Sequence, residues 1–192
     1  MTDLETLLDD LTSGDDMVAE NAALALRELG EQAIKPLSAL LEVEDTDSRW
    51  WAIRTLALFN SQKTTKYLLK GLKDPDIGVQ QCAALGLREN PTPTAIPELM
   101  AHLGHEDQIL SRLAGDALIS IGKEATQGLV EIVENGEQTA KMEAVRALSL
   151  IGDQDSIPAL FKVLEDGSMM MRYWAEKGLE KMGVGMVFFN PE

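Results

Sequence analysis

The sequence predicts an all-α solenoid of about six two-helix repeats, each 30–31 residues long. The main observation is an alanine column that recurs at intervals of 30, 31, 31, 30 and 31 residues. Two leucine columns, one before it and one after it, recur at the same intervals. Repetition at this period is typical of stacked repeats, which bury their apolar faces only against their neighbours. The alanine column is Ala22, Ala52, Ala83, Ala114, Ala144 and Ala175.

The first helix of each repeat is predicted from apolar residues spaced three, four or seven apart, as at Ile34, Leu37 and Leu41. This spacing places them on one stripe of a helix with 3.6 residues per turn. Proline near the start of such a helix costs no hydrogen bond, because the first N–H groups have no intrahelical partner. These prolines are Pro36, Pro97 and Pro158.

The second helix of each repeat carries the alanine column. A cap residue stands seven positions before each alanine, where an oxygen can accept from free N–H groups and an acid favours the positive end of the helix. These residues are Asp15, Asp45, Asp76, Asp107 and Glu137, with Ser168 in the last repeat. A residue that tolerates a left-handed conformation, or a proline, is expected to end the helix. The predicted ends are Gly30, Asn60, Pro91, Gly122, Gly152 and Gly183.

A column of small residues follows three positions after each alanine. Small side chains there let neighbouring helices approach closely, while the leucine one position on fills the remaining space. We therefore expect one continuous core along the stack. The column is Ala25, Thr55, Gly86, Ala117, Ala147 and Gly178.

The repeats predict a single domain over residues 1–183, followed by an apolar tail at residues 184–192. Thr2 and Glu5 fit a capping box at the start of the first helix. The tail contains Val187, Phe188 and Phe189, and we expect it to cover the open face of the last repeat. A dimer contact through that face is the alternative.

The two-helix pattern resembles the short HEAT-like repeats named after phycobilisome (bilin) lyases, over roughly residues 3–183. The best-matching stretches are Ser48–Arg54 and Met171–Glu176. The resemblance implies a right-handed HEAT-like solenoid. It also implies a range of functions, from bilin attachment or isomerisation to di-iron hydroxylation and scaffolding, because a fold does not fix an activity.

Composition excludes several classes. The chain has 192 residues with 17 basic and 32 acidic side chains, for a net charge of −15. Broad nucleic-acid binding needs a basic footprint, so the charge argues against it. The single cysteine, Cys82, excludes an internal disulfide and suggests a reducing compartment. No leader or membrane-spanning stretch is visible, so we expect a cytoplasmic protein without a membrane partner.

Catalytic patterns are scarce, and we predict no catalytic, cofactor-binding or metal-binding residue. His102, His105 and Glu106 have a metal-like spacing, but packing and turn positions explain both histidines better. Cys82 stands one residue before a column alanine, and a buried thiol is the favoured interpretation over a nucleophile. No phosphate-binding loop, dinucleotide motif or nucleophile elbow is present.

All seven arginines fall on the second helices or their first turns. We expect those helices to line the concave face and to form an exposed, partner-binding ridge, because rings and arginines are typical of binding hot spots. The predicted residues are Trp50, Arg54, Arg88, Arg112, Arg146, Tyr173 and Lys177. Trp50 with Arg54 and Tyr173 with Lys177 are spaced for cation–π contacts. Packing and solubility are the alternative roles. Arg49, Lys141 and Arg172 are instead expected to brace adjacent repeats.

The sequence therefore favours a non-enzymatic scaffold or adaptor that binds an acidic or amphipathic protein segment in its concave groove. The alternative is a subunit of a bilin lyase or isomerase that acts on phycobiliproteins and stacks a tetrapyrrole on the groove's rings. That alternative follows from the resemblance and not from any catalytic residue in the chain.

Overall fold

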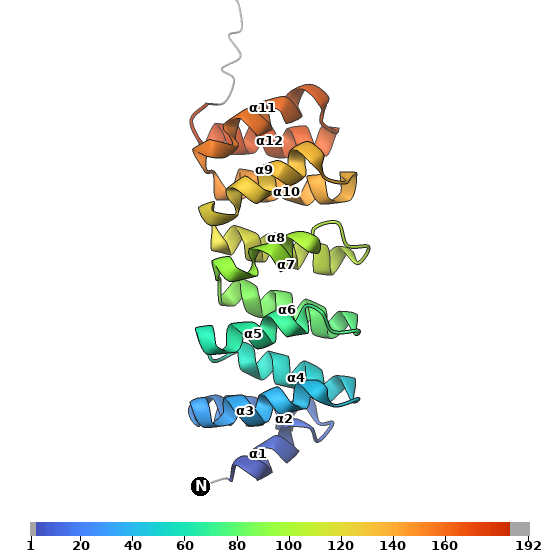
Figure 1. Ribbon diagram of the computed structural model, residues 1–192, viewed down its shortest axis with the longest axis vertical. Helices are drawn as coiled ribbons and strands as arrows, with labels where there is room; N and C mark the ends of the chain where they lie inside the picture. The colour runs from blue at the N-terminus through green and yellow to red at the C-terminus, as the bar shows by residue number, and fades with distance from the viewer. Residues whose placement is uncertain (1–2, 185–192) are drawn as a thin grey trace, which may run out of the picture. The chain divides into compact units, whose positions relative to one another are not determined.

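Helices form all the regular secondary structure in residues 3–184, which are the residues that the computed structural model describes (Figure 1). They comprise twelve α-helices and four short 3₁₀ helices. The predicted all-α class of two-helix repeats is confirmed, since each repeat contributes one helix to each of two sets.

The first helices of the repeats are called A helices and the second ones B helices. The A helices are α1 (Leu4–Leu11), α3 (Glu31–Ala39), α5 (Gln62–Gly71), α7 (Ile96–Ala101), α9 (Thr126–Asn135) and α11 (Ile157–Asp166). The B helices are α2 (Asp16–Glu28), α4 (Thr46–Ala57), α6 (Ile77–Glu89), α8 (Gln108–Ile121), α10 (Gln138–Ile151) and α12 (Met169–Lys181). The 3₁₀ helices are η1 (Leu40–Glu42), η2 (Pro93–Ala95), η3 (Lys123–Ala125) and η4 (Gln154–Ser156).

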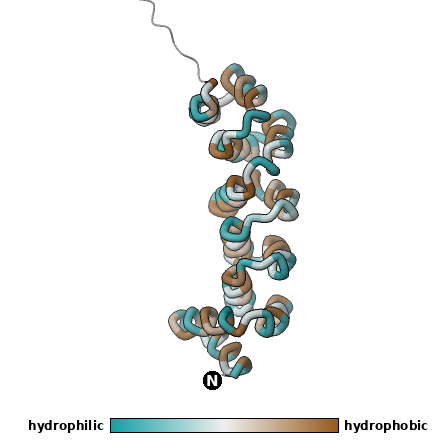
Figure 2. Tube along the Cα trace, turned by 90° about the vertical axis from the view of Figure 1, so that its left-hand side faces the viewer, coloured by the Kyte–Doolittle hydropathy of each residue, from teal (hydrophilic) through white to brown (hydrophobic). Residues whose placement is uncertain are grey.

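The chain divides into two compact units, Met1–Glu98 and Leu99–Glu192. In unit 1, α4 packs against α2, α5 and α6, and in unit 2, α10 packs against α8, α9 and α12. Within each unit the A and B helices therefore lie side by side in two layers (Figure 2). Single-domain behaviour over residues 1–183 stays a prediction.

Five of the six B helices begin at predicted caps whose side chains accept hydrogen bonds, whereas Glu137, at the N-cap of α10, makes no such bond. Asp15, Asp45, Asp76 and Asp107 each accept hydrogen bonds from backbone N–H groups two or three residues on. Ser168 does the same for α12, with Met171 N donating to its hydroxyl. These bonds satisfy donors that the first turn of a helix leaves unpaired, which explains where the helices start.

The B helices also end where the sequence predicts. Gly30, Gly122, Gly152 and Gly183 all have φ between 66° and 87°, and Asn60 has φ of 43°. This left-handed region is open to glycine and is tolerated by asparagine. The third repeat ends differently, as expected, because α6 stops at Glu89 and Asn90 with Pro91 follows it.

The core of each unit is built from the repeated columns. Every residue of the alanine column and of both leucine columns is buried. The small-residue column allows the expected close approach. A Cβ added at Gly86 would lie 2.9 Å from Ala57 Cβ, and one at Gly178 would lie 2.8 Å from Ser149 Cα. B helices consequently pack almost backbone to backbone at these two places.

Two end features lie partly outside the described residues. The predicted capping box depends on Thr2, and the structural description begins at residue 3, where Asp3 is the N-cap without a side-chain bond. The tail prediction for residues 184–192 falls on residues 185–192, which are also outside it. Among the described helices, none has the length and apolar character that a membrane span requires.

Candidate functional site

The arginine groove lies at the C-terminal ends of three successive B helices of unit 1, α2, α4 and α6. It has a volume of about 490 Å³, and we define it by Arg27, Arg54 and Arg88 together with Leu58 and Leu85. Each arginine lies in the last turn of its helix, where the negative end of the helix dipole favours a cation. The repeat thus brings one arginine from each of three helices to one groove.

The three arginines differ in their ion pairs. Arg54 Nη2 lies 3.0 Å from Glu20 Oε1, which reaches across from α2. Arg88 Nη2 lies 2.7 Å from Oε1 of the adjacent Glu89. Arg27 is exposed and makes no ion pair within residues 3–184. Because both pairs are well exposed to solvent, they hold their arginines only weakly.

The lining of the arginine groove includes apolar side chains beside the arginines. Leu85 is exposed, Leu58 is half-buried, and Cys82 is buried. Burial raises the pKa of the Cys82 thiol to about 12, although nearby Arg54 acts in the opposite direction. A thiol that stays protonated at neutral pH is a poor nucleophile, so the buried-thiol interpretation is confirmed.

Arg27 and Asn90 are among the groove residues that were not predicted as site residues. Arg27 occupies the same repeat position as Arg88, so the column itself carried the signal. Asn90 Nδ2 donates to the Ala57 carbonyl at 2.9 Å and to the Gly86 carbonyl at 2.8 Å. It therefore ties the end of α4 to α6 and fixes the spacing of the groove's walls.

Trp50 lies in a different groove of unit 1, at the N-terminal ends of the B helices. This groove of about 590 Å³ is lined by Trp50 and Trp51 and by cap aspartates, including Asp45 and Asp76. The two tryptophan rings meet edge to face at 5.0 Å between centroids. Arg54 pairs with Glu20 instead of the Trp50 ring, so the expected cation–π pair is not formed.

Arg146 in unit 2 is buried, so its predicted place on an exposed ridge is wrong. It is 1% exposed, with Nη1 at 2.8 Å from Asp116 and Nε at 2.7 Å from Glu143. The space exists because residue 115 is glycine, where a Cβ would lie 2.7 Å from Arg146 Nη2. Two carboxylates then neutralise the buried guanidinium. Arg146 thus supports α8 and α10 from within.

The other predicted residues of unit 2 are exposed on its B helices. Arg112 lies 3.7 Å from Asp116 and 3.8 Å from Glu143, at the edge of the Arg146 cluster. Tyr173 stands edge-on to Trp174 at 5.6 Å between centroids.

Lys177 pairs with Glu180 at 2.9 Å, and this hydrogen bond raises the pKa of the Lys177 ammonium. The predicted cation–π contact between Tyr173 and Lys177 is therefore also not formed. That these exposed side chains contact a partner stays a prediction.

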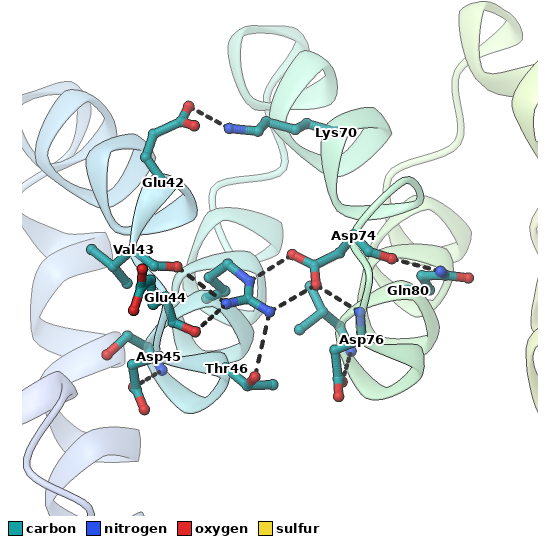
Figure 3. A network of polar contacts seen from close by, with 12 residues as sticks. Glu42, Val43, Glu44, Asp45, Thr46, Lys70, Asp74, Asp76 and Gln80 are labelled. Carbon is teal, nitrogen blue, oxygen red and sulfur yellow. Dashed lines mark hydrogen bonds and ion pairs between the residues drawn. The ribbon is translucent and has the colours of Figure 1, made fainter.

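Arg49 braces two repeats, as predicted. Its Nε and Nη2 donate to the two carboxylate oxygens of Asp74 at 2.8 and 3.1 Å, and Nη1 donates to the carbonyls of Val43 and Glu44. Figure 3 shows Val43, Glu44 and Asp74 around this one guanidinium. The hydrogen bond to Asp74 raises the pKa of Arg49. This arginine is structural.

The two histidines belong to the turn after α7. His105 Nδ1 accepts a hydrogen bond from Asp107 N at 3.0 Å, and its ring stacks on that of His102 at 6.0 Å between centroids. The predicted turn position of His105 is confirmed. In residues 3–184, no group of three or more His, Cys, Asp or Glu side chains has an arrangement that could hold a metal ion.

Comparison with known families agrees with this architecture. The sequence pattern of HEAT repeats matches residues 4–79 and 65–139. The chain belongs to the HEAT repeat family. A PBS lyase HEAT-like repeat matches residues 140–166 of this HEAT repeat chain, which confirms the resemblance. A phycobilisome maturation protein from Synechococcus elongatus is 31% identical over 101 residues. That alignment covers 52% of this chain and 49% of the relative, so the chain matches about half of the relative's length.

Solved structures show the same fold. A HEAT-like repeat protein from Thermococcus onnurineus has a TM-score of 0.65 and 14% identity, over 99% of this chain and 84% of that one. The complex of CpcE and CpcF of phycocyanin lyase from Nostoc sp. PCC7120 has a TM-score of 0.57 and 24% identity, over 95% and 78%. A designed armadillo repeat protein in complex with the peptide (KR)4 has a TM-score of 0.55 and 19% identity, over 94% and 100%. At these identities the likeness concerns the fold alone.

Proposed function

We propose that this HEAT repeat protein is a non-enzymatic adaptor that binds an acidic, amphipathic segment of another protein in the arginine groove. The observation that carries the proposal is the convergence of Arg27, Arg54 and Arg88, from three successive repeats, on one groove that Leu58 and Leu85 also line. Within residues 3–184, Arg27 has no carboxylate partner. A groove of this kind fits a ligand that supplies carboxylates and apolar side chains together.

The chemistry favours carboxylates over other polar groups. A guanidinium presents donors in a fixed fork that matches both oxygens of a carboxylate, and the resulting charge-assisted bonds are stronger than neutral ones. Leu58 and Leu85 line the same groove and provide apolar area. The net charge of −15 repels acidic partners at a distance, but physiological salt screens charges beyond about 8 Å. Recognition therefore depends on the local groove.

In this proposal the remaining predicted residues play different parts. Trp50 in unit 1 and Arg112, Tyr173 and Lys177 in unit 2 are exposed or half-buried, so each is available for contact with a partner. The proposal places the protein in the cytoplasm, where Cys82 stays reduced. It involves no nucleic acid, membrane or cofactor.

A subunit of a bilin lyase or isomerase is the second candidate. The observations that favour it are the PBS lyase HEAT-like repeat at residues 140–166 and the similarity to a phycobilisome maturation protein. Under this hypothesis the groove's arginines pair with the propionates of a tetrapyrrole. Co-expression with a bilin and an apo-phycobiliprotein tests it. Covalent pigment on the phycobiliprotein that depends on this chain would support this candidate over the adaptor.

A binding assay with matched variants tests the adaptor proposal. The probe is a short fluorescent peptide of alternating glutamate and leucine, and the readout is anisotropy. The groove variant R27Q/R54Q/R88Q is expected to weaken binding at least about tenfold, since each charge-assisted bond contributes about 1 kcal/mol or more. The control variant K35Q/K63Q/K66Q removes equal charge from exposed positions on the A helices of unit 1.

The control variant is expected to bind like the wild type. Equal loss in both variants would mean that the peptide senses only overall charge, and this result would overturn the groove assignment. A glutamine–leucine peptide with the same label sets the background of the assay.

A further inference from the structure

We infer that the carboxylates of Glu20 and Glu89 pair with groove arginines in the free protein and are replaced by ligand carboxylates on binding. The groove therefore selects a segment that carries at least two carboxylates around an apolar centre. The inference rests on the proposed function and adds to it how the site is held before a partner arrives. In the free protein, Glu20 forms an ion pair with Arg54, and Glu89 forms one with Arg88.

The arginines of the two groove pairs are more exposed than Arg49 and Arg146. The Arg54 and Glu20 side chains are 33% and 42% exposed, and those of Arg88 and Glu89 are 39% and 63% exposed. Arg49 and Asp74 are each only 10% exposed, and Arg146 is 2% exposed. Water reaches the two groove pairs more easily than it reaches the guanidinium groups of Arg49 and Arg146. The groove pairs can therefore open without leaving a buried guanidinium unpaired, as can the exposed Arg112 pair of unit 2.

Exchange of carboxylates conserves charge at each arginine. Arg54 and Arg88 are paired before the ligand arrives and after it binds, while the released Glu20 and Glu89 side chains pass into water. The ligand carboxylates replace these glutamates because binding also buries Leu58 and Leu85 under the ligand's apolar side chains, which adds favourable free energy. A neutral segment would have to displace the glutamates and leave both guanidinium groups without a partner, so it is rejected.

Arg27 gives the exchange a starting point. It lines the same groove and makes no ion pair within the described part of the chain, so a first carboxylate can bind there before any internal pair opens. Arg27 lies on α2, the helix that also carries Glu20, the partner of Arg54. Because Arg27 and Arg54 line the same groove, a ligand held by Arg27 can reach the Arg54 pair with its next carboxylate.

The test measures affinity for the alternating glutamate–leucine peptide in E20Q, E89Q and E20Q/E89Q. Removing both carboxylates is expected to tighten binding roughly three- to tenfold, because the ligand then has no internal ion pair to break. The gain is modest because each exposed pair contributes only a fraction of the energy of a buried one. The control E5Q/E44Q removes two exposed carboxylates of unit 1 that do not line the groove. It is expected to change affinity less than twofold, a change of under ~0.4 kcal/mol. Circular dichroism checks that each variant is folded.

The possible outcomes separate the two proposals. Tighter binding by E20Q/E89Q than by E5Q/E44Q supports the exchange, even if the wild type binds too weakly to measure. Binding by the wild type that E20Q/E89Q leaves unchanged or weakens overturns the exchange and leaves the adaptor proposal standing. Failure of the wild type and of E20Q/E89Q to bind the peptide overturns both.

Discussion

Arg49 and Asp74 form a two-point ion pair between successive repeats, with Nε to Oδ2 at 2.8 Å and Nη2 to Oδ1 at 3.1 Å. Both side chains are nearly buried, and Arg49 also donates to two backbone carbonyls in the turn before α4. Figure 3 shows a contrasting pair beside it, Glu42 with Lys70, which lies at the surface.

The first prediction concerns this brace. The substitution D74A is expected to lower the free energy of unfolding by about 3 kcal/mol, because it leaves a nearly buried guanidinium without its carboxylate. The control K70A breaks an exposed pair and is expected to cost less than about 1 kcal/mol. Urea unfolding followed by circular dichroism measures both. Similar small losses in the two variants would show that the brace contributes little.

The second prediction concerns close helix packing in unit 2. At Gly178 a Cβ would meet the Ser149 backbone of α10, whereas at Gly128 it would meet only the flexible thioether end of Met100. G178A is therefore expected to destabilise the protein by about 1–3 kcal/mol. G128A is expected to be neutral or to stabilise by up to about 1 kcal/mol, since alanine is the better helix former. Thermal unfolding of both variants checks the order, and equal melting temperatures would contradict it.

The third prediction concerns the Arg146 cluster. R146A is expected to cost about 3–5 kcal/mol, because Asp116 and Glu143 lose the cation that neutralises them in a buried setting. R112A touches the same two carboxylates from the surface and is expected to cost less than about 1 kcal/mol. Chemical unfolding distinguishes the two. A larger loss for R112A than for R146A would reverse the roles assigned to these arginines.

The fourth prediction concerns thiol reactivity. With the pKa of Cys82 near 12, alkylation by iodoacetamide at pH 8 is expected to be on the order of 100- to 1,000-fold slower in the folded protein than in urea. The rate in the folded protein should keep rising above pH 9, since the thiolate fraction is still small there. Mass spectrometry gives both rates. A folded-state rate that levels off near pH 9 would indicate an exposed, ordinary thiol.

The features of the fold that the sequence predicts correctly are those set by local patterns. Helix caps such as Asp76 and helix ends such as Gly152 depend on a few neighbouring residues, so one repeat predicts the next. The burial of Arg146 depends on a different repeat. It fits because Gly115 stands in the preceding helix, whereas the equivalent residue before Arg54 is Ala23. Column position alone could not separate the two arginines.

The candidate site was only partly predicted, again because the column position of a residue does not fully determine its surroundings. Arg54 and Arg88 do share a groove, but Trp50, four residues before Arg54, lies in the groove at the other end of the B helices. A helix face and a place along the helix are separate coordinates, and the repeat pattern specifies the first better than the second. Arg27 illustrates the importance of the place along the helix, because it reaches the groove from the last turn of α2.

The central claim is that the arginine groove binds acidic segments, and arginine side-chain NMR tests it most directly. The Nε–Hε signals of Arg27, Arg54 and Arg88 are expected to shift as the alternating glutamate–leucine peptide is added, because their guanidinium groups take up new carboxylates. Those of Arg49 and Arg146 are expected to stay in place, because these residues remain in their buried pairs. Binding that leaves the three groove signals unmoved would contradict the claim.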